Sequence, residues 1–162
     1  MEVKKIEFTW LLAYWIINLI NLRKIFISSD HAGYKLKEQI KLHLSKKKIS
    51  FKDMGPYNDD RVDYPDFAHK VAKKVKTNKN NFGILVCGSG MGMNIAANRH
   101  KNIRAAQCFN LKSTKLSRLH NDANIITLGS RLLSKKLALT CVIAFLNTKF
   151  EGGRHLKRIK KI

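Results

Sequence analysis

The chain of 162 residues has little proline and little cysteine, with two and three residues respectively. The cysteines, Cys87, Cys108 and Cys141, are odd in number and form no CxxC pair, which argues against a disulfide scaffold or a zinc ribbon. They favour a reducing compartment, and we expect a cytoplasmic location. The hydrophobic fraction of 44% is large enough for a buried core, which excludes disorder and collagen-like structure. The length fits one α/β domain.

Acidic residues are also scarce, since 11 Asp and Glu stand against 32 Lys and Arg and leave a net charge of +21. Two explanations are open: a polyanion-binding surface, or the composition that A/T-rich codons produce, with solvated lysines. The 24 lysines outnumber the 8 arginines and are spread along most of the chain. This spread favours the compositional explanation, and we expect no nucleic-acid partner.

No apolar run is long enough to cross a bilayer. The densest one covers residues 8–20, which is 13 residues against the roughly 20 that a spanning helix needs. It holds Trp10 and Trp15, and no small-x-small cleavage site follows it. Residues 1–23 are therefore interpreted as an apolar extension, from a misassigned start or as a weak membrane anchor. Residues 24–162 form the predicted domain, for which no membrane association is expected.

From residue 24 the chain alternates short apolar runs with helical patterns, which is typical of βαβ units. The sequence predicts an α/β fold: a Rossmann-like, three-layer α/β/α sandwich around a five-stranded parallel sheet. The expected strands are 25–28, 49–52, 82–87, 103–108 and 125–128. The expected helices are 34–46, 66–76, 91–99, 111–120 and 134–147, the last with Ser134 as its N-cap, and a basic tail follows from residue 152.

The strongest local signal is the run CGSGMG at residues 87–92, directly after the most apolar strand. Its spacing is not GxGxxG, it carries no Lys-Ser/Thr pair, and residue 93 is Met where a phosphatase loop needs Arg. A dinucleotide fold is therefore disfavoured, and a Walker loop and a phosphatase loop are excluded. What remains is Cys87 at a strand end beside a helix N-terminus, where a thiolate is stabilised. The alternative is a buried structural thiol.

Other predicted strand ends and the tail also carry polar residues. Asp30 and His31 follow the first strand, Arg131 follows the fifth, and His120 with Asn121 precedes it. Each has a plain structural interpretation, as a helix cap or a solvated charge. Their common placement favours a ligand site at the carboxyl edge of the sheet.

Six motifs occur in the order and spacing of one enzyme family. They are DHAGYxLK at 30–37, DYP at 63–65, CGSGMG at 87–92, SRxHNDAN at 117–124, GSR at 129–131 and EGGRH at 151–155. On these residues the chain resembles ribose-5-phosphate isomerase type B, of the ribose/galactose isomerase family, over about residues 24–158. The resemblance implies interconversion of ribose 5-phosphate and ribulose 5-phosphate through an enediolate, in the pentose phosphate pathway, without cofactor or metal.

The resemblance also implies roles for individual residues. Cys87 would be the base at C2, His120 the acid that opens the furanose ring, and Ser89 a hydrogen-bonding or proton-shuttling hydroxyl. The other residues would bind the substrate. Backbone N–H groups of the loop would hold the enediolate oxygen: Gly88, Ser89, Gly90, Met91 and Gly92. The side chains of Asp30, Tyr64 and Asn121 would hold the sugar, and those of His31, Arg131, Arg154 and Arg158 would hold the phosphate.

In the family the site is shared between subunits, which implies a homodimer or a dimer of dimers with His120 and Asn121 supplied by the partner. Two alternatives are open. One is an isomerase of a six-carbon sugar phosphate, such as allose 6-phosphate or galactose 6-phosphate. The other is a basic nucleic-acid-binding protein on the same fold.

Overall fold

The computed structural model describes residues 24–162, and the predictions for residues 1–23 lie outside this part of the chain. Five parallel strands form one sheet in the order β2-β1-β3-β5-β4, which confirms the predicted sheet. The strands are β1 (Ile25–Ser29), β2 (Lys52–Asp53), β3 (Phe82–Cys87), β4 (Ala105–Gln107) and β5 (Ile125–Gly129).

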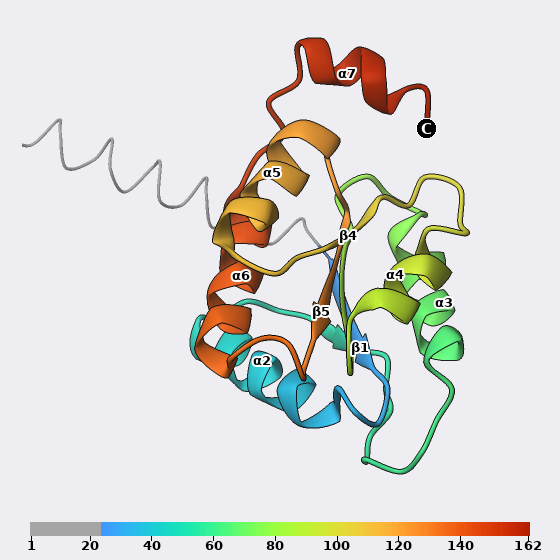
Figure 1. Cartoon of the computed structure of the whole chain (residues 1–162), viewed down its shortest axis with the longest axis vertical. Helices are drawn as coiled ribbons and strands as arrows, with labels where there is room; N and C mark the ends of the chain where they lie inside the picture. The colour runs from blue at the N-terminus through green and yellow to red at the C-terminus, as the bar shows by residue number, and fades with distance from the viewer. Residues whose placement is uncertain (1–23) are drawn as a thin grey trace, which may run out of the picture.

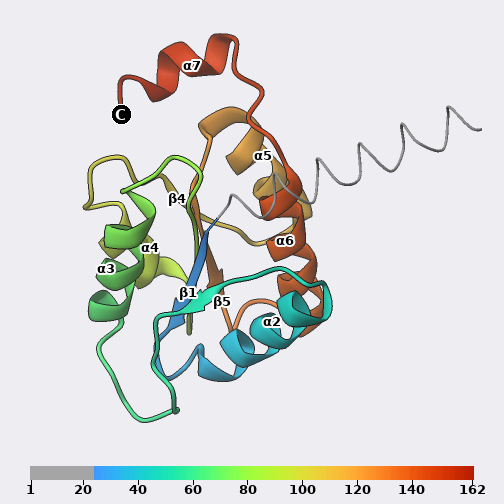
Figure 2. The same ribbon diagram turned by 180° about the vertical axis from the view of Figure 1, so that it is seen from behind.

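Helices cover both faces of the sheet, as predicted (Figures 1 and 2). One face carries α2 (Tyr34–Lys46), α5 (Leu111–Asn121) and α6 (Lys135–Asn147), and the other carries α3 (Tyr64–Val75) and α4 (Met91–Ala97). The predicted N-cap of α6 is confirmed, because Ser134 accepts a hydrogen bond from the Leu137 N–H at 3.3 Å. None of the helices within residues 24–162 is long and apolar enough to span a membrane.

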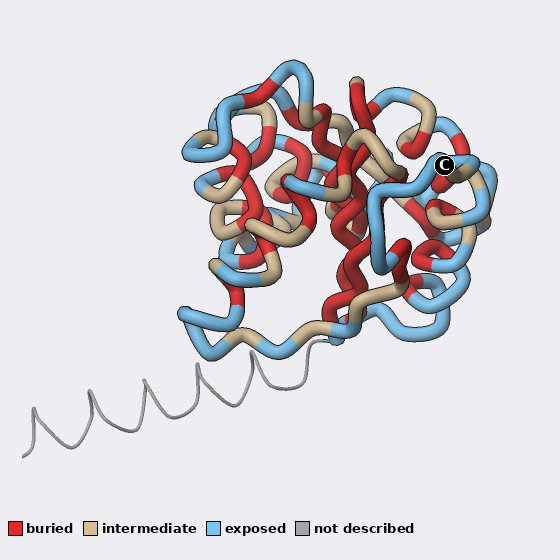
Figure 3. Tube along the Cα trace, turned by 90° about the horizontal axis from the view of Figure 1, so that it is seen from below, coloured by how far each residue is buried: buried red, intermediate tan, exposed pale blue. Residues whose placement is uncertain are grey.

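The core lies on both faces of the central strands. All six residues of β3 are buried, which explains why its sequence is almost wholly apolar rather than alternating. In Figure 3 the buried segments run through the middle of the molecule and the exposed ones lie on the outside. Two apolar clusters result, one under α2 and α6 and one under α3 and α4.

The structure corrects two predicted strands and adds a helix. Pairing of β2 with β1 begins only at Lys52, although Ile49 and Phe51 pack against the core and gave the pattern that placed a strand at 49–52. Strand β4 is shorter than 103–108, because Ile103 closes a turn through its N–H to the His100 carbonyl. The basic tail contains a short helix, α7 (Arg154–Ile159), beyond the end of α5.

A buried lysine ties α2 to the loop after β2. The Lys37 side chain is fully buried, and its Nζ lies 3.1 Å from both carboxylate oxygens of Asp53 and donates to the Pro56 carbonyl. The neighbouring Gly55 carbonyl accepts from the Ser29 N–H at 3.2 Å. The ion pair therefore anchors the loop that supports the end of β1, where the polar residues Asp30 and His31 follow.

We expect Asp53→Asn to lower the free energy of unfolding by about 3 kcal/mol, because it leaves the buried Lys37 ammonium with only the more exposed Glu38 carboxylate, 3.3 Å away, as a charge partner. Urea denaturation at pH 7 measures this, and the double variant Lys37→Met, Asp53→Asn should recover part of the loss.

Burial opposes ionisation, yet hydrogen bonds from Lys41, the Gly55 N–H and Lys37 lower the pKa of Asp53. Its contribution is therefore present above the unfolded pKa and lost as pH falls through the folded one. Wild-type stability at pH 7 in Asp53→Asn would contradict the assignment.

Candidate active site

The cleft at the carboxyl edge of the sheet lies where the chain changes faces. After β1 the chain enters α2 on one face, and after the adjacent β3 it enters α4 on the other, which is the position where open α/β sheets bind ligands. The cleft has a volume of about 330 Å³. Its lining includes eight of the predicted site residues: Asp30, His31, Tyr64, Cys87, Gly88, Ser89, Gly92 and Arg131.

The Cys87 thiol lies at the base of this cleft, at the last position of β3. Only 4% of the residue is exposed, and Sγ accepts a hydrogen bond from the Gly90 N–H at 3.1 Å. Gly90 has φ +82°, a conformation that other residues rarely adopt, and this turn directs its N–H back to the sulfur. The Gly90 N–H holds the sulfur in place at the edge of the cleft, a placement that suits Cys87 to act as a base or nucleophile.

The glycine loop, residues 88–92, is held by hydrogen bonds and by packing against Tyr64. The Ser89 hydroxyl accepts from the Met91 N–H at 3.3 Å, and the Ser89 carbonyl accepts from Gln107 Nε2 at 2.7 Å. The ring of Tyr64 lies so close to Gly92 that a Cβ there would come within 2.7 Å of it. Gln107 was not among the predicted residues, because it stands on β4 and reaches the loop only through the fold.

Polar groups from the first and fifth strands complete the cleft. Asp30 Oδ1 accepts from the Gly33 N–H at 2.8 Å, which fixes this nearly buried carboxylate at the start of α2. His31 Nδ1 lies 3.3 Å from the Val62 carbonyl oxygen, and this contact orients the ring. Arg131 follows β5, and its N–H donates to the Gly88 carbonyl at 3.0 Å. A carboxylate, an imidazole and a guanidinium therefore line the same cleft as Cys87.

Four predicted residues lie elsewhere. Helix α5 runs back from the carboxyl edge, so His120 and Asn121 at its end lie at the amino edge of the sheet, and α7 carries Arg154 and Arg158 beyond them (Figure 1). The five residues of a strand such as β5 separate the two edges by about 16 Å at ~3.3 Å per residue. Within one chain, His120 and Cys87 therefore belong to different surfaces.

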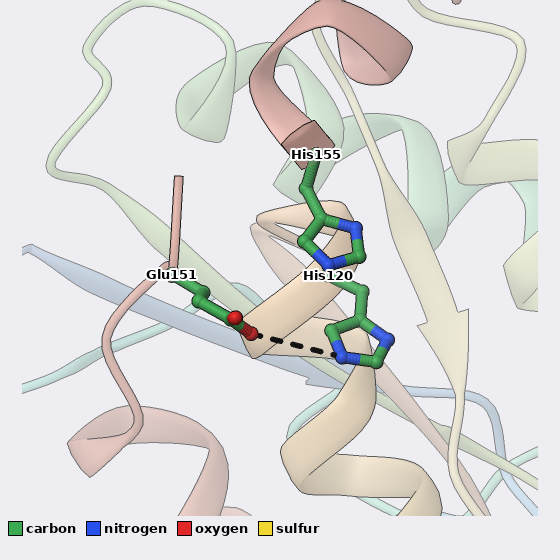
Figure 4. A group of neighbouring side chains, drawn as sticks. All are labelled: His120, Glu151 and His155. Carbon is green, nitrogen blue, oxygen red and sulfur yellow. Dashed lines mark ion pairs between the residues drawn. The ribbon is translucent and has the colours of Figure 1, made fainter. Parts of the chain in front are cut away.

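At the amino edge His120 belongs to a cluster with Glu151 and His155 (Figure 4). Their possible ligand atoms lie within 4.8 Å of one another, the one grouping of this kind found within residues 24–162. The two rings are stacked with an interplanar angle of 7°. Parallel rings do not direct their lone pairs at one point, as tetrahedral zinc requires, so the geometry favours stacking over shared metal ligation.

A second pocket, of about 260 Å³, opens at the same edge between α3 and α5. Its polar groups are engaged with one another: Arg104 and Arg118 lie 2.9 and 2.7 Å from the carboxylate of Asp122. Asp122 is the left-handed C-cap of α5. These contacts hold the end of the helix, and they assign a structural role to this pocket.

Comparison with known proteins agrees with this geometry. A family model described as Ribose/Galactose Isomerase matches residues 25–162. The ribose-5-phosphate isomerase B of Escherichia coli is 41% identical over 141 residues, which cover 87% of this chain and 95% of the relative.

Solved structures show the same fold. A ribose 5-phosphate isomerase of Thermotoga maritima superposes with a TM-score of 0.83 at 50% identity, covering 85% of this chain and 95% of that one. The ribose-5-phosphate isomerase B of Mycoplasma genitalium with bound ribulose-5-phosphate gives 0.83 at 45% identity, covering 86% and 93%. The predicted resemblance is therefore confirmed, and the chain belongs to the ribose/galactose isomerase family.

Proposed function

We propose that the chain interconverts ribose 5-phosphate and ribulose 5-phosphate by proton transfer alone, as a cytoplasmic enzyme of the pentose phosphate pathway. The observation that carries the proposal is Cys87, which lines the cleft and whose sulfur accepts the Gly90 N–H at 3.1 Å. The family match and the ribulose 5-phosphate bound to a 45% identical relative support the choice of substrate. The three free cysteines fit a reducing compartment.

In this reaction the Cys87 thiolate removes the proton from C2 of the open-chain aldose. The electron pair of the C–H bond forms the C1–C2 double bond, and negative charge develops on O1. Transfer of the O2 proton to O1, the formation of the C2 carbonyl and return of the proton from Cys87 to C1 give the ketose and restore the thiolate. The N–H groups of Gly90 and Met91 donate to Cys87 and Ser89, so the other backbone N–H groups of residues 88–92 would stabilise the charged oxygen, an interaction that contributes about 3 kcal/mol per fixed donor. Ser89 would hydrogen-bond the same oxygens.

The remaining cleft residues would bind the rest of the sugar. Asp30 is held by Gly33 and would accept hydrogen bonds from sugar hydroxyls, and Tyr64 would cover the ring. Arg131 and His31 border the cleft and would bind the phosphate, for which the planar guanidinium is well suited. The polar groups therefore divide into a set at the reacting carbons and a set at the phosphate.

The proposal includes a homodimer with shared sites, and the same packing could repeat in a dimer of dimers. Ring opening and phosphate binding would use His120, Asn121, Arg154 and Arg158, which lie at the edge of the sheet opposite Cys87. A second copy that presents its α5 end and α7 to the cleft of the first would bring both sets together.

A substrate comparison tests the proposal. We expect the purified full chain to isomerise ribose 5-phosphate with a kcat/KM at least about 10-fold above that for allose 6-phosphate or galactose 6-phosphate, since one additional carbon unit costs roughly that factor. Ketose formation followed in a coupled assay measures this. A preference for a six-carbon phosphate would assign the alternative substrate, and inactivity on all three would refute the proposed function.

A further inference from the structure

Two side chains from separate parts of the C-terminal region contact the His120 imidazole. The ring of His155, on α7, stacks on it with centroids 4.2 Å apart and planes within 7° of parallel. Glu151, between α6 and α7, places Oε2 3.8 Å from His120 Nε2 (Figure 4). The backbone fixes this approach, because the Glu151 N–H donates to the Leu119 carbonyl at 3.1 Å. One face and one nitrogen of His120 are thus engaged.

The protonation of His155 is determined by its neighbours. Arg154 Nε donates to His155 Nε2 at 3.4 Å, so this nitrogen is an acceptor and the neutral ring carries its proton on Nδ1. Burial, together with the positive charge of His120, Arg154 and Arg158, lowers the pKa of His155, and Glu151 opposes the shift. His155 is therefore neutral and nearly buried, and its ring stacks on that of the partly exposed His120.

We propose that Glu151 and His155 are positioning residues for His120, Glu151 fixing the direction of Nε2 and His155 fixing the plane of the ring. This rests on the proposed function, in which His120 is the ring-opening acid. The two ring nitrogens of an imidazole point in different directions, and Nδ1 lies on the side of His120 away from Glu151 (Figure 4). Nδ1 is therefore the nitrogen that faces the substrate, and Nε2 is the one that is held.

In ring opening the C1–O4 bond of the furanose breaks with its electron pair moving to O4, which takes the proton from His120 Nδ1. The O1 proton passes to water as the C1 carbonyl forms, and His120 regains its proton from solvent. Glu151 and His155 do not touch the sugar. They act by keeping His120 oriented, as an orienting carboxylate does for a catalytic histidine.

Two reactions of the same enzyme separate this role from a structural one. Ribulose 5-phosphate is acyclic, because its C5 oxygen is esterified and cannot close a furanose ring. Exchange of its C1 hydrogen for deuterium in D₂O, followed by NMR, therefore requires the Cys87 step but not ring opening. Isomerisation of ribose 5-phosphate requires both. A defect confined to the second reaction identifies a residue that serves His120.

In Glu151→Gln and His155→Ala we expect ribose 5-phosphate isomerisation to fall about 10-fold, while deuterium exchange stays within about twofold of wild type. His155→Phe keeps a flat ring against His120 and should stay within about threefold in both reactions. Glu38→Gln is the matched control: Glu38 lies on α2 beside Lys41 and Lys37, and because Asp53 still pairs with Lys37, its loss should change neither reaction.

The outcomes are distinguishable. Equal loss of both reactions in Glu151→Gln, or loss of neither, would overturn the positioning role. Should His120→Ala reduce deuterium exchange as much as isomerisation, the ring-opening role assumed for His120 would fail instead, and the proposed function would need a different acid.

Discussion

Replacing Cys87 by alanine is expected to lower kcat by about 10³-fold, the loss typical of removing the base from a proton transfer. The side chain is small and lies at a strand end, so the strand and the glycine loop should fold as before. Circular dichroism and calorimetric titration with inorganic phosphate should therefore match wild type, while the coupled isomerase assay falls near background. Iodoacetamide should inactivate the wild-type enzyme, and ribose 5-phosphate should protect it.

The other two cysteines provide the controls. Cys108 and Cys141 are buried in the apolar cluster under α6, and burial raises the pKa of the Cys108 thiol despite hydrogen bonds from Thr114 and Ser117. Cys108→Ser keeps a partner in the Ser117 hydroxyl and should retain activity within about threefold. Near-normal turnover in Cys87→Ala, or a comparable loss in Cys108→Ser, would remove Cys87 from the mechanism.

Mixing two inactive variants is expected to restore activity. Cys87→Ala and His120→Ala should each be nearly inactive, because each lacks one partner in every site. If a site takes Cys87 from one subunit and His120 from the other, random exchange leaves about a quarter of the sites intact, one in each heterodimer. The coupled assay after subunit exchange should therefore rise to about a quarter of wild-type activity.

Exchange must be verified independently, for example by native mass spectrometry of subunits with different isotopic labels. A mixture that exchanges fully and stays inactive would place both residues in one subunit's site. That result would conflict with a strand-length separation of about 16 Å between the two edges of the sheet. Mixing Cys87→Ala with Ser89→Ala is the matched control, because both residues stand on the same loop and should not complement.

The local sequence was sufficient for the features that depend on neighbouring residues. An apolar strand, a run of glycines and a following helix place Cys87 at the N-terminus of α4, and each of these elements is determined by residues within a few positions. The order of strands and helices was likewise predicted, because each element has its own apolar period. Element ends were less exact: Ile49 and Phe51 alternate like a strand, yet β2 begins only where β1 offers a pairing partner.

The tertiary structure decided which distant residues meet. Lys37 and Asp53 form a buried pair, and Gln107 reaches the carbonyl of Ser89, although no pattern in the chain connects them. The motif EGGRH was recognised from the sequence, but only the fold of the tail shows that Glu151 and His155 contact His120. Such contacts depend on the path of the chain around the sheet, which local periodicity does not encode.

The sequence by itself therefore determined the fold class, the family resemblance and the reactive loop with Cys87. The tertiary structure decided that His120 and Cys87 lie at opposite edges of one sheet. The physical reason is the direction of the chain: in a parallel sheet every strand runs from the amino edge to the carboxyl edge, and every connecting helix runs back. Cys87 ends a strand and His120 ends a helix, so the fold places them a full strand length apart.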